Sequence, residues 1–308
     1  MGAPSVVTVG AFDGVHLGHQ ALLREVRERA RARGSPAVVV TFEPHPGAVL
    51  GSSPARLTTA LERSEILAEL GIDRLHVLRF DPELASLSAE RFVREVLVSR
   101  FGMDELVIGT DGGFGRARGA NSGTLPGLGA RFGFAVRIIP PVADPDSRLI
   151  SSSGIRRALA DGDLALAARW LGRPYRLTGR VVRGAGRGAS IGFRTINLEG
   201  PDPDKQLPPD GVYAARVEWG GGTAGAMLNQ GTRPTIGDTR RSIEAHLFEW
   251  SGTLYDRTIR VEWVQRLRDT RRFESLEALK HQLTQDRNAA QAVLAREPET
   301  LTAPSLGR

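Results

Sequence analysis

Short apolar segments alternate with helical segments through residues 6–171, and this alternation limits the possible folds more than any other feature. The segments that predict strands are residues 6–11, 37–42, 75–80, 106–109 and 134–139. After the first of them, residues 19–33 carry apolar side chains at helical spacing, and Gly34 follows as a stop signal. Because strands that are apolar on both faces are buried on both faces, we expect a doubly wound parallel sheet covered by helices.

Three further helices complete this half of the chain. Thr59 and Glu62 have the spacing of a capping box, which predicts the start of a helix that ends at Gly71. Residues 89–101 predict the next helix, and a last helical stretch over residues 153–171 closes the half.

After Arg173 and Pro174 the pattern changes to short strands separated by turns. The strands predicted there are residues 176–182, 211–219, 223–228, 242–250 and 258–267. Residues 213–219 alternate in the manner of a half-buried strand, and the whole set predicts a small antiparallel β-barrel followed by a helix at residues 276–294. We therefore expect a Rossmann-like α/β domain at residues 1–172, a barrel domain at residues 173–296 and a flexible tail at residues 297–308.

Composition excludes several classes of chemistry. The chain has no cysteine, which excludes disulfides, thiolate nucleophiles, zinc ribbons and iron–sulfur ligation. Lys205 and Lys280 are the only lysines, and neither lies in a Gly-Lys-Ser/Thr sequence, so an ATP site here would work without a P-loop. The absence of a signal peptide and of an apolar run of about 18 residues predicts a cytoplasmic protein with no membrane partner.

Residues 10–20 (GAFDGVHLGHQ) follow the first predicted strand and open the first helix. His16 and His19 are three residues apart, so both rings project to one side of the helix N-terminus, which attracts phosphate groups. Gly18 lets a nucleotide approach the backbone closely. This arrangement predicts a triphosphate site; a loop with two solvated histidines is the alternative, which the position after the first strand disfavours.

A second candidate phosphate segment precedes the last helix of this half. Ser152 or Ser153 can cap that helix and donate to a phosphate, and Arg156 can reach a phosphate from the first turn. Taken alone, a plain helix cap with an exposed arginine explains the segment better.

Taken together, these segments and residues 41–46 (TFEPHP) resemble the adenylyltransferase half of the bacterial bifunctional riboflavin kinase/FMN adenylyltransferase family, also called FAD synthetases. The resemblance continues, in the same order, through residues 171–182, 211–214, 229–235, 243–247 and 266–269. It therefore covers nearly the whole chain.

The resemblance implies that the first domain is a nucleotidyltransferase that transfers AMP from ATP to FMN. It implies catalytic roles for His16, His19 and Arg156, and flavin contacts for Asp111 and Phe114. The ATP-binding residues it implies are Gly10, Phe12, Asp13, Gly18, Ser152 and Ser153. Gly112 stands where the family has an aromatic residue near the flavin; its loss is expected to weaken flavin binding by about 1 kcal/mol or more, or to make room for an altered ring.

In the second domain, the resemblance implies phosphorylation of riboflavin. Gly192 and Asn197 would bind ATP, Thr195 and Asn197 would hold Mg²⁺, and Glu244 would be the catalytic base. The family's Pro and Ala are replaced by Arg194 and Ile196 in this loop. In addition, Asp256 stands where the family commonly has Gly.

Other interpretations are weaker. Residues 188–192 fit a G-x-S-x-G pattern with His246 or His281 downstream, but no helix is predicted after Ser190, as a hydrolase elbow requires. The chain has a formal charge of +6, without a nucleic-acid recognition motif, so nucleic acid is not an expected partner.

We therefore expect flavin cofactor synthesis from small-molecule substrates: ATP with Mg²⁺, riboflavin and FMN. The alternatives are a specialised paralogue with one activity or a modified flavin, and a non-catalytic regulator that binds flavin or nucleic acid. A homo-oligomer is compatible with the sequence.

Overall fold

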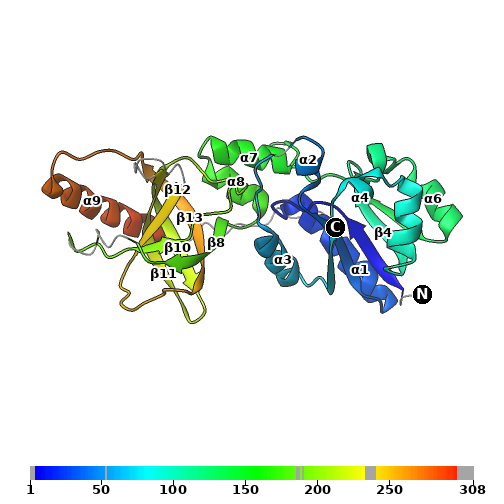
Figure 1. Ribbon diagram of the computed structural model, residues 1–308, viewed down its shortest axis with the longest axis horizontal. Coiled ribbons are helices and arrows are strands. Elements are labelled where there is room, and N and C mark those ends of the chain that lie inside the picture. The colour runs from blue at the N-terminus through cyan, green and yellow to red at the C-terminus, as the bar shows by residue number, and fades with distance from the viewer. Residues whose placement is uncertain (1–3, 53, 185–187, 189–190, 233–240, 297–308) are drawn as a thin grey trace. The chain divides into compact units, whose positions relative to one another are not determined.

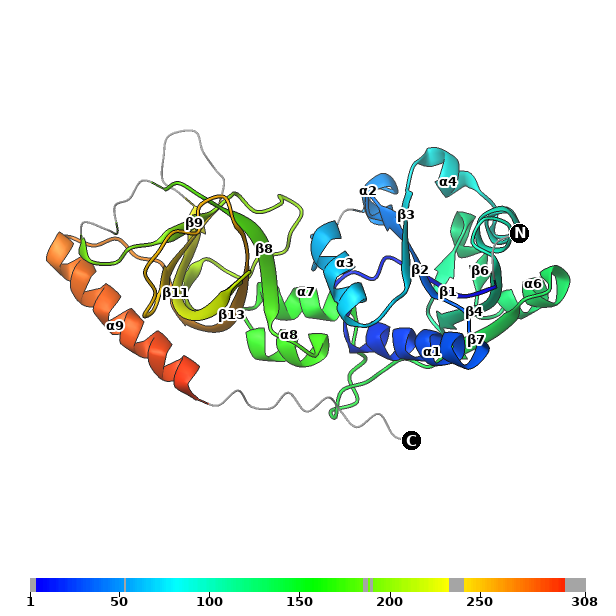
Figure 2. The same ribbon diagram turned by 90° about the horizontal axis from the view of Figure 1, so that it is seen from below.

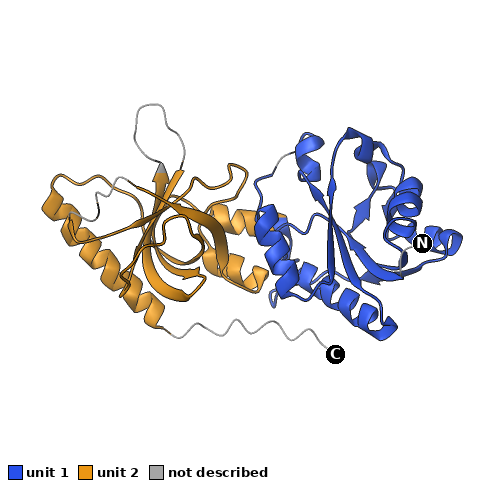
Figure 3. Cartoon of the chain, turned by 60° about the horizontal axis from the view of Figure 1, so that its bottom comes forward, with its two compact units in different colours: residues 1–152 blue, residues 153–308 orange. Residues whose placement is uncertain are grey.

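The computed structural model describes residues 4–52, 54–184, 188, 191–232 and 241–296. Contacts divide the chain into two compact units, residues 1–152 and 153–308 (Figure 3). The predicted tail at residues 297–308, Ser190 of the hydrolase pattern and residues 233–235 of the family resemblance lie outside the described residues. The predicted boundary at residue 172 stays a prediction.

A five-stranded parallel sheet forms the centre of the first unit (Figure 1). Its order is β3-β2-β1-β4-β7. β2 and β3 therefore lie on one side of β1, whereas β4 and β7 lie on its other side. This reversal creates a topological switch point between β1 and β4, where open α/β sheets bind ligands. The strands are β1 (Ser5–Val9), β2 (Ala37–Glu43), β3 (Arg74–Arg79), β4 (Met103–Gly109) and β7 (Ala135–Ile139).

Helices cover both faces of this sheet, as expected for a doubly wound fold. On one face, α1 (Leu17–Arg33) and α3 (Ala60–Glu69) pack against side chains that include Val6 and Val39. On the other face, Val7 and Val40 pack against the segment around Phe92 and against α6 (Leu125–Phe132). Shorter elements connect these: α2 (Pro46–Val49), α4 (Pro82–Ser86), α5 (Ala89–Arg91), η1 (Phe92–Val98), β5 (Gly113–Phe114), η2 (Arg116–Arg118) and β6 (Ala120–Asn121).

Local signals in the first unit are confirmed, with two differences. The capping box is present, because Thr59 and Glu62 exchange side-chain and backbone hydrogen bonds at the start of α3. The helix predicted over residues 89–101 instead changes after one turn into a π-helix, in which backbone N–H groups bond five residues back. β3 lies at the sheet edge and is largely exposed, so it is not the doubly buried strand that its apolar pattern predicted.

The second unit begins with two helices rather than one. α7 (Ser152–Ala160) ends before Gly162, whose φ of +78° breaks the helix. α8 (Leu164–Leu171) then starts with Asp163 as its cap and packs against the barrel strands β8 (Tyr175–Val182) and β13 (Thr258–Arg268). The single helical stretch predicted over residues 153–171 is therefore wrong.

A closed six-stranded barrel follows these two helices (Figure 2). Its strands are β8 (Tyr175–Val182), β9 (Ile196–Leu198), β10 (Gly211–Trp219), β11 (Gly222–Thr232), β12 (Arg241–Leu247) and β13 (Thr258–Arg268). β9 was not predicted, because three residues carry too little periodic signal. β12 ends at Leu247, three residues earlier than predicted.

The terminal helix α9 (Leu276–Ala295) lies across β10, β11 and β13. It buries Val212 and Ala214 on the outer side of β10, while Tyr213 and Ala215 are also buried. Residues 211–215 are thus buried on both faces, and the half-buried strand predicted there is wrong over this part. A bidentate ion pair joins the barrel to the helix, since Arg268 donates to both carboxylate oxygens of Asp286.

Candidate functional site

A cavity of about 640 Å³ lies at the carboxyl edge of the first unit's sheet. Such a volume suits a small-molecule ligand. The residues that follow β1 and β4 line it, so it occupies the switch point. Of the predicted site residues, those in its wall are Gly10, Phe12, His16, Gly18, His19, Asp111, Phe114 and Ser152.

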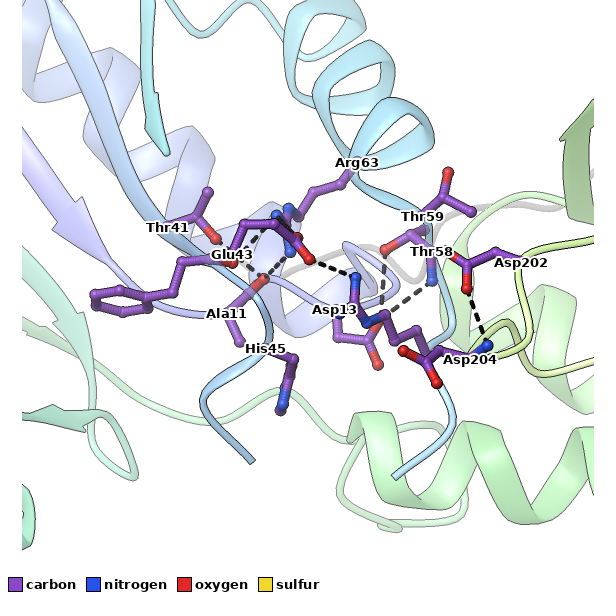
Figure 4. A network of polar contacts seen from close by, with 12 residues as sticks. Ala11, Asp13, Thr41, Glu43, His45, Thr58, Thr59, Arg63, Asp202 and Asp204 are labelled. Carbon is purple, nitrogen blue, oxygen red and sulfur yellow. Dashed lines mark hydrogen bonds and ion pairs between the residues drawn. The ribbon is translucent and has the colours of Figure 1, made fainter. Parts of the chain in front are cut away.

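The turn between β1 and α1 is held in an unusual backbone conformation. Phe12, Gly14 and Val15 have φ values of +50°, +80° and +40°, and a positive φ is rare for a β-branched residue. Asp13 stabilises the turn from inside: its carboxylate accepts hydrogen bonds from the backbone N–H groups of Leu57 and Thr58, at 2.9 and 3.1 Å (Figure 4). The buried Asp13 therefore holds two loops together, and it is absent from the wall of the cavity.

A buried arginine fixes the strand ends beside this turn. Arg63 donates to the carbonyl oxygens of Ala11 and Phe42 and pairs with Glu43 at 3.2 Å (Figure 4). Burial lowers the pKa of the Arg63 guanidinium, and the nearby Glu43 carboxylate opposes that shift. Arg63 thus ties the end of β1 to the end of β2.

The two histidines lie together at the start of α1. His16 is the N-cap, and its Nδ1 accepts a hydrogen bond from the backbone N–H of His19 at 3.4 Å. In the neutral ring the hydrogen is therefore on Nε2. The His19 ring stacks on the His16 ring and also contacts Phe12, at centroid distances of 3.8 and 5.2 Å.

Gly10 and Gly18 make room for neighbouring rings. A Cβ at Gly18 would lie 3.2 Å from the His16 ring, and a Cβ at Gly10 would lie 3.2 Å from Phe12. At both glycines, a ring of the chain itself lies close to the backbone. It provides a structural reason for Gly18 besides the predicted approach of a nucleotide.

The second phosphate segment is divided between the units. The Ser152 hydroxyl donates to the carbonyl oxygen of Asp13 at 2.9 Å, so it belongs to the wall of the first unit's cavity. Ser153 and Arg156 follow in α7, within the second unit. The predicted roles of these two residues stay predictions.

Phe114 has a packing role at the predicted flavin side. The residue is 7% exposed, its ring centroid lies 5.3 Å from that of Phe92, and it still borders the cavity. A Cβ at Gly112 would lie only 2.5 Å from Cγ1 of Ile108. The Ile108 side chain therefore occupies the space that a side chain at position 112 would need.

Sequence reasoning missed two arginines in the same wall. Arg116 and Arg118 lie in a short turn between Gly115 and Gly119 and border the cavity. Arg118 donates to the carbonyl oxygen of Asp111 and lies over Gly113. The signal that could have identified them is a pair of arginines flanked by glycines, several residues after a strand that ends at the switch point.

In the second unit, the predicted kinase residues surround β9. Asn197 is buried and pairs in register with Glu244 on β12. Thr195 precedes the strand, and Gly192 has a φ of +85°, which favours glycine. Of the two departures from the family pattern, Ile196 is buried in the barrel and Arg194 is exposed.

Asp256 also has a conformational explanation. Its φ is +65°, a left-handed value that glycine adopts without strain and that aspartate tolerates better than most residues. This accounts for the family's glycine at the same position.

The oxygen donors of this loop fit Mg²⁺. A threonine hydroxyl and an asparagine amide oxygen are hard neutral ligands, and Mg²⁺ typically takes few protein ligands while it keeps waters and nucleotide phosphates. Within the described ranges, no group of three or more His, Asp or Glu side chains is arranged to hold a metal ion. The loop therefore suits a Mg²⁺ ion that binds together with ATP.

The fold and the cavity define a protein of two units. The first is an α/β unit of the kind that binds nucleotides, and the second is a closed antiparallel barrel. A family model described as FAD synthetase matches residues 2–154, and one described as riboflavin kinase matches residues 171–294. The chain belongs to the bifunctional riboflavin kinase/FMN adenylyltransferase family.

Relatives of that name match over most of their length. The protein from Pseudomonas fluorescens is 41% identical over 293 residues, which are 94% of this chain and 93% of the relative. The Escherichia coli K12 protein is 39% identical over 97% of this chain and 94% of its own. The Bacillus subtilis protein is 36% identical over 94% and 92%. These relatives favour flavin cofactor synthesis over the specialised paralogue and over the non-catalytic regulator.

A solved structure has the same fold throughout. It is described as a macrolide-efflux protein from Streptococcus pneumoniae, is 32% identical, and covers 94% of this chain and 95% of its own with a TM-score of 0.84. In the described part of this chain, none of the helices combines the length and apolarity needed to cross a lipid bilayer.

Proposed function

We propose that the chain makes FMN from riboflavin in its second unit and FAD from FMN in its first unit, using ATP and Mg²⁺. The observation that carries this proposal is the match of both family models, in order, over nearly the whole chain. The first unit's cavity at the switch point, with two histidines at a helix N-terminus, supports it. We propose residues 1–172 and 173–296 as the two domains and, because both reactions consume ATP, the cytoplasm as the location.

In the first unit, a phosphate oxygen of FMN attacks the α-phosphorus of ATP. The bond between the α-phosphorus and the bridging oxygen breaks, and pyrophosphate leaves. His16 and His19 point their rings to one side of the α1 N-terminus, where ring N–H groups and free backbone N–H groups stabilise the charge that develops on the phosphates. The clamped turn at Asp13 holds this geometry in advance of binding.

In the second unit, the Glu244 carboxylate accepts the proton of the riboflavin 5′-hydroxyl. The hydroxyl oxygen then attacks the γ-phosphorus of ATP and ADP leaves. Thr195 and Asn197 would hold Mg²⁺, which supplies charge neutralisation on the phosphates when bound. The register between Glu244 and Asn197 supports this arrangement, since it sets the base beside the loop that carries the oxygen donors.

The test uses the purified full chain with riboflavin, ATP and Mg²⁺, with flavin products separated by chromatography. We expect FMN first and FAD afterwards, with pyrophosphate released in step with FAD. If FMN supplied directly yields FAD while riboflavin yields no FMN, the two-reaction proposal is wrong.

A further inference from the structure

His246 connects the catalytic strand of the second unit to the loop before β9. Along β12, Ile243, Ala245 and Leu247 are buried, so Glu244 and His246 share the other face. Nδ1 of His246 lies 2.8 Å from the carbonyl oxygen of Arg194. Because a carbonyl oxygen only accepts, Nδ1 carries the hydrogen and donates it.

Phe193 anchors the same loop from the neighbouring position. It is 4% exposed, belongs to the apolar cluster beneath α9, and donates its backbone N–H to the carbonyl oxygen of Gly188 at 2.8 Å. The Phe193 and His246 rings meet edge to face at 5.3 Å, and the Arg287 guanidinium lies over the Phe193 ring. The loop before β9 is therefore anchored at Phe193, one residue before Arg194.

The residues that follow Arg194 carry the oxygen donors. Thr195 comes directly after it, and Asn197 is paired in register with Glu244. A proline at position 194 would fix φ by its ring, whereas arginine leaves that torsion free. The hydrogen bond to the carbonyl oxygen of Arg194 restrains the next part of the backbone, the peptide plane between Arg194 and Thr195.

We propose that His246 is a positioning residue for riboflavin phosphorylation. Its Nδ1–H holds the carbonyl of Arg194 and thereby orients Thr195 and Asn197 toward the Mg²⁺–nucleotide. This inference rests on the kinase reaction proposed above. His246 needs no contact with substrate for this role; it acts through the backbone of the loop.

Three variants separate the hydrogen bond from ring packing: His246→Ala, His246→Asn and His246→Gln. The amide nitrogen of Asn can occupy the place of Nδ1, whereas that of Gln reaches the place of Nε2. We expect the KM for ATP in FMN formation to rise about threefold to tenfold in the Ala and Gln variants, and to stay near the unaltered value in the Asn variant. Formation of FAD from supplied FMN is the internal control and should not change.

Hydrogen exchange measured by mass spectrometry adds a readout independent of activity. Backbone amides of residues 191–198 should exchange faster in His246→Ala and return to slow exchange in His246→Asn. An unchanged KM for ATP in His246→Ala, equal rescue by Gln and Asn, or parallel loss of both reactions would overturn the proposal. If the unaltered chain forms no FMN, the kinase reaction itself is wrong, and hydrogen exchange still decides whether His246 holds the loop.

Discussion

The imidazole rings of His16 and His19 are stacked, with centroids 3.8 Å apart and planes inclined by 20°. This pair, with Phe12 against His19, forms one wall of the cavity at the end of β1. The stack sets both rings at the helix end where a phosphate group is best stabilised. We therefore expect the two histidines to act only in the adenylylation proposed for the first unit.

His19→Ala should therefore remove FAD formation and spare FMN formation. We expect the rate of adenylylation to fall about 100-fold or more, as for other lost charge-stabilising donors. Chromatography of the flavin products from riboflavin, and separately from FMN, measures both. His76→Ala is the matched control, because His76 stacks on Phe101 outside the cavity wall. Equal loss of both reactions in His19→Ala would argue against two separate sites.

Replacing Asp13 should lower the stability of the first unit. Its carboxylate accepts from two backbone N–H groups and from the Thr58 hydroxyl, so Asp13→Ala leaves buried donors unsatisfied. We expect the free energy of unfolding of the first unit to fall by about 1–3 kcal/mol, measured by calorimetry. All 4 tryptophans lie in residues 170–263, so tryptophan fluorescence follows only the second unit and should not change. Asp146→Ala, at an exposed residue, should change little; a similar loss there would contradict the buried role of Asp13.

Restoring an aromatic residue at position 112 should damage the first unit. A side chain there meets Ile108, so Gly112→Ala should cost about 1–3 kcal/mol and Gly112→Phe more, without a gain in FMN affinity. Calorimetry and quenching of flavin fluorescence provide the two measurements. Gly127→Ala is the control, because nothing lies within 4 Å of its Cβ in α6, and it should stabilise slightly. Tighter FMN binding by Gly112→Phe would show that the position is open.

Glu262 should make the second unit less stable as pH rises. Burial raises the pKa of its carboxyl, and Glu218 adds to that shift, while Arg176, Arg216 and Arg260 oppose it. A carboxyl whose folded pKa exceeds its unfolded value of about 4.3 favours folding most below that pH. The contribution is lost as pH rises through the folded pKa.

Glu262→Gln removes this titration. The stability gained by the variant over the unaltered chain should therefore be small near pH 4 and should grow toward pH 7. Urea unfolding followed by tryptophan fluorescence at both pH values measures the difference, with Glu274→Gln, at an exposed residue that does not perturb Glu262, as control. A difference that is constant with pH, or that shrinks, contradicts the raised pKa.

Much of the fold follows from local pattern. The spacing of apolar residues in β1, β2 and α1 and the capping box at Thr59 involve residues that are close together in the sequence. They can therefore be predicted from the sequence alone. The phosphate segment at residues 10–20 is likewise one continuous stretch after a strand. Its histidines were identified because strand, glycine turn and helix start are all adjacent in the sequence.

Other features depend on contacts between residues that are far apart in the chain. Such contacts produce no periodic pattern in the sequence. The Asp13 carboxylate is directed to Leu57 and Thr58 rather than to the cavity. Residues 211–215 of β10 are buried on both faces because α9 covers their outer side, and β9 forms because it pairs with β8 and β12. Each outcome is decided by packing and hydrogen-bond satisfaction between distant segments, which residue type and spacing alone do not encode.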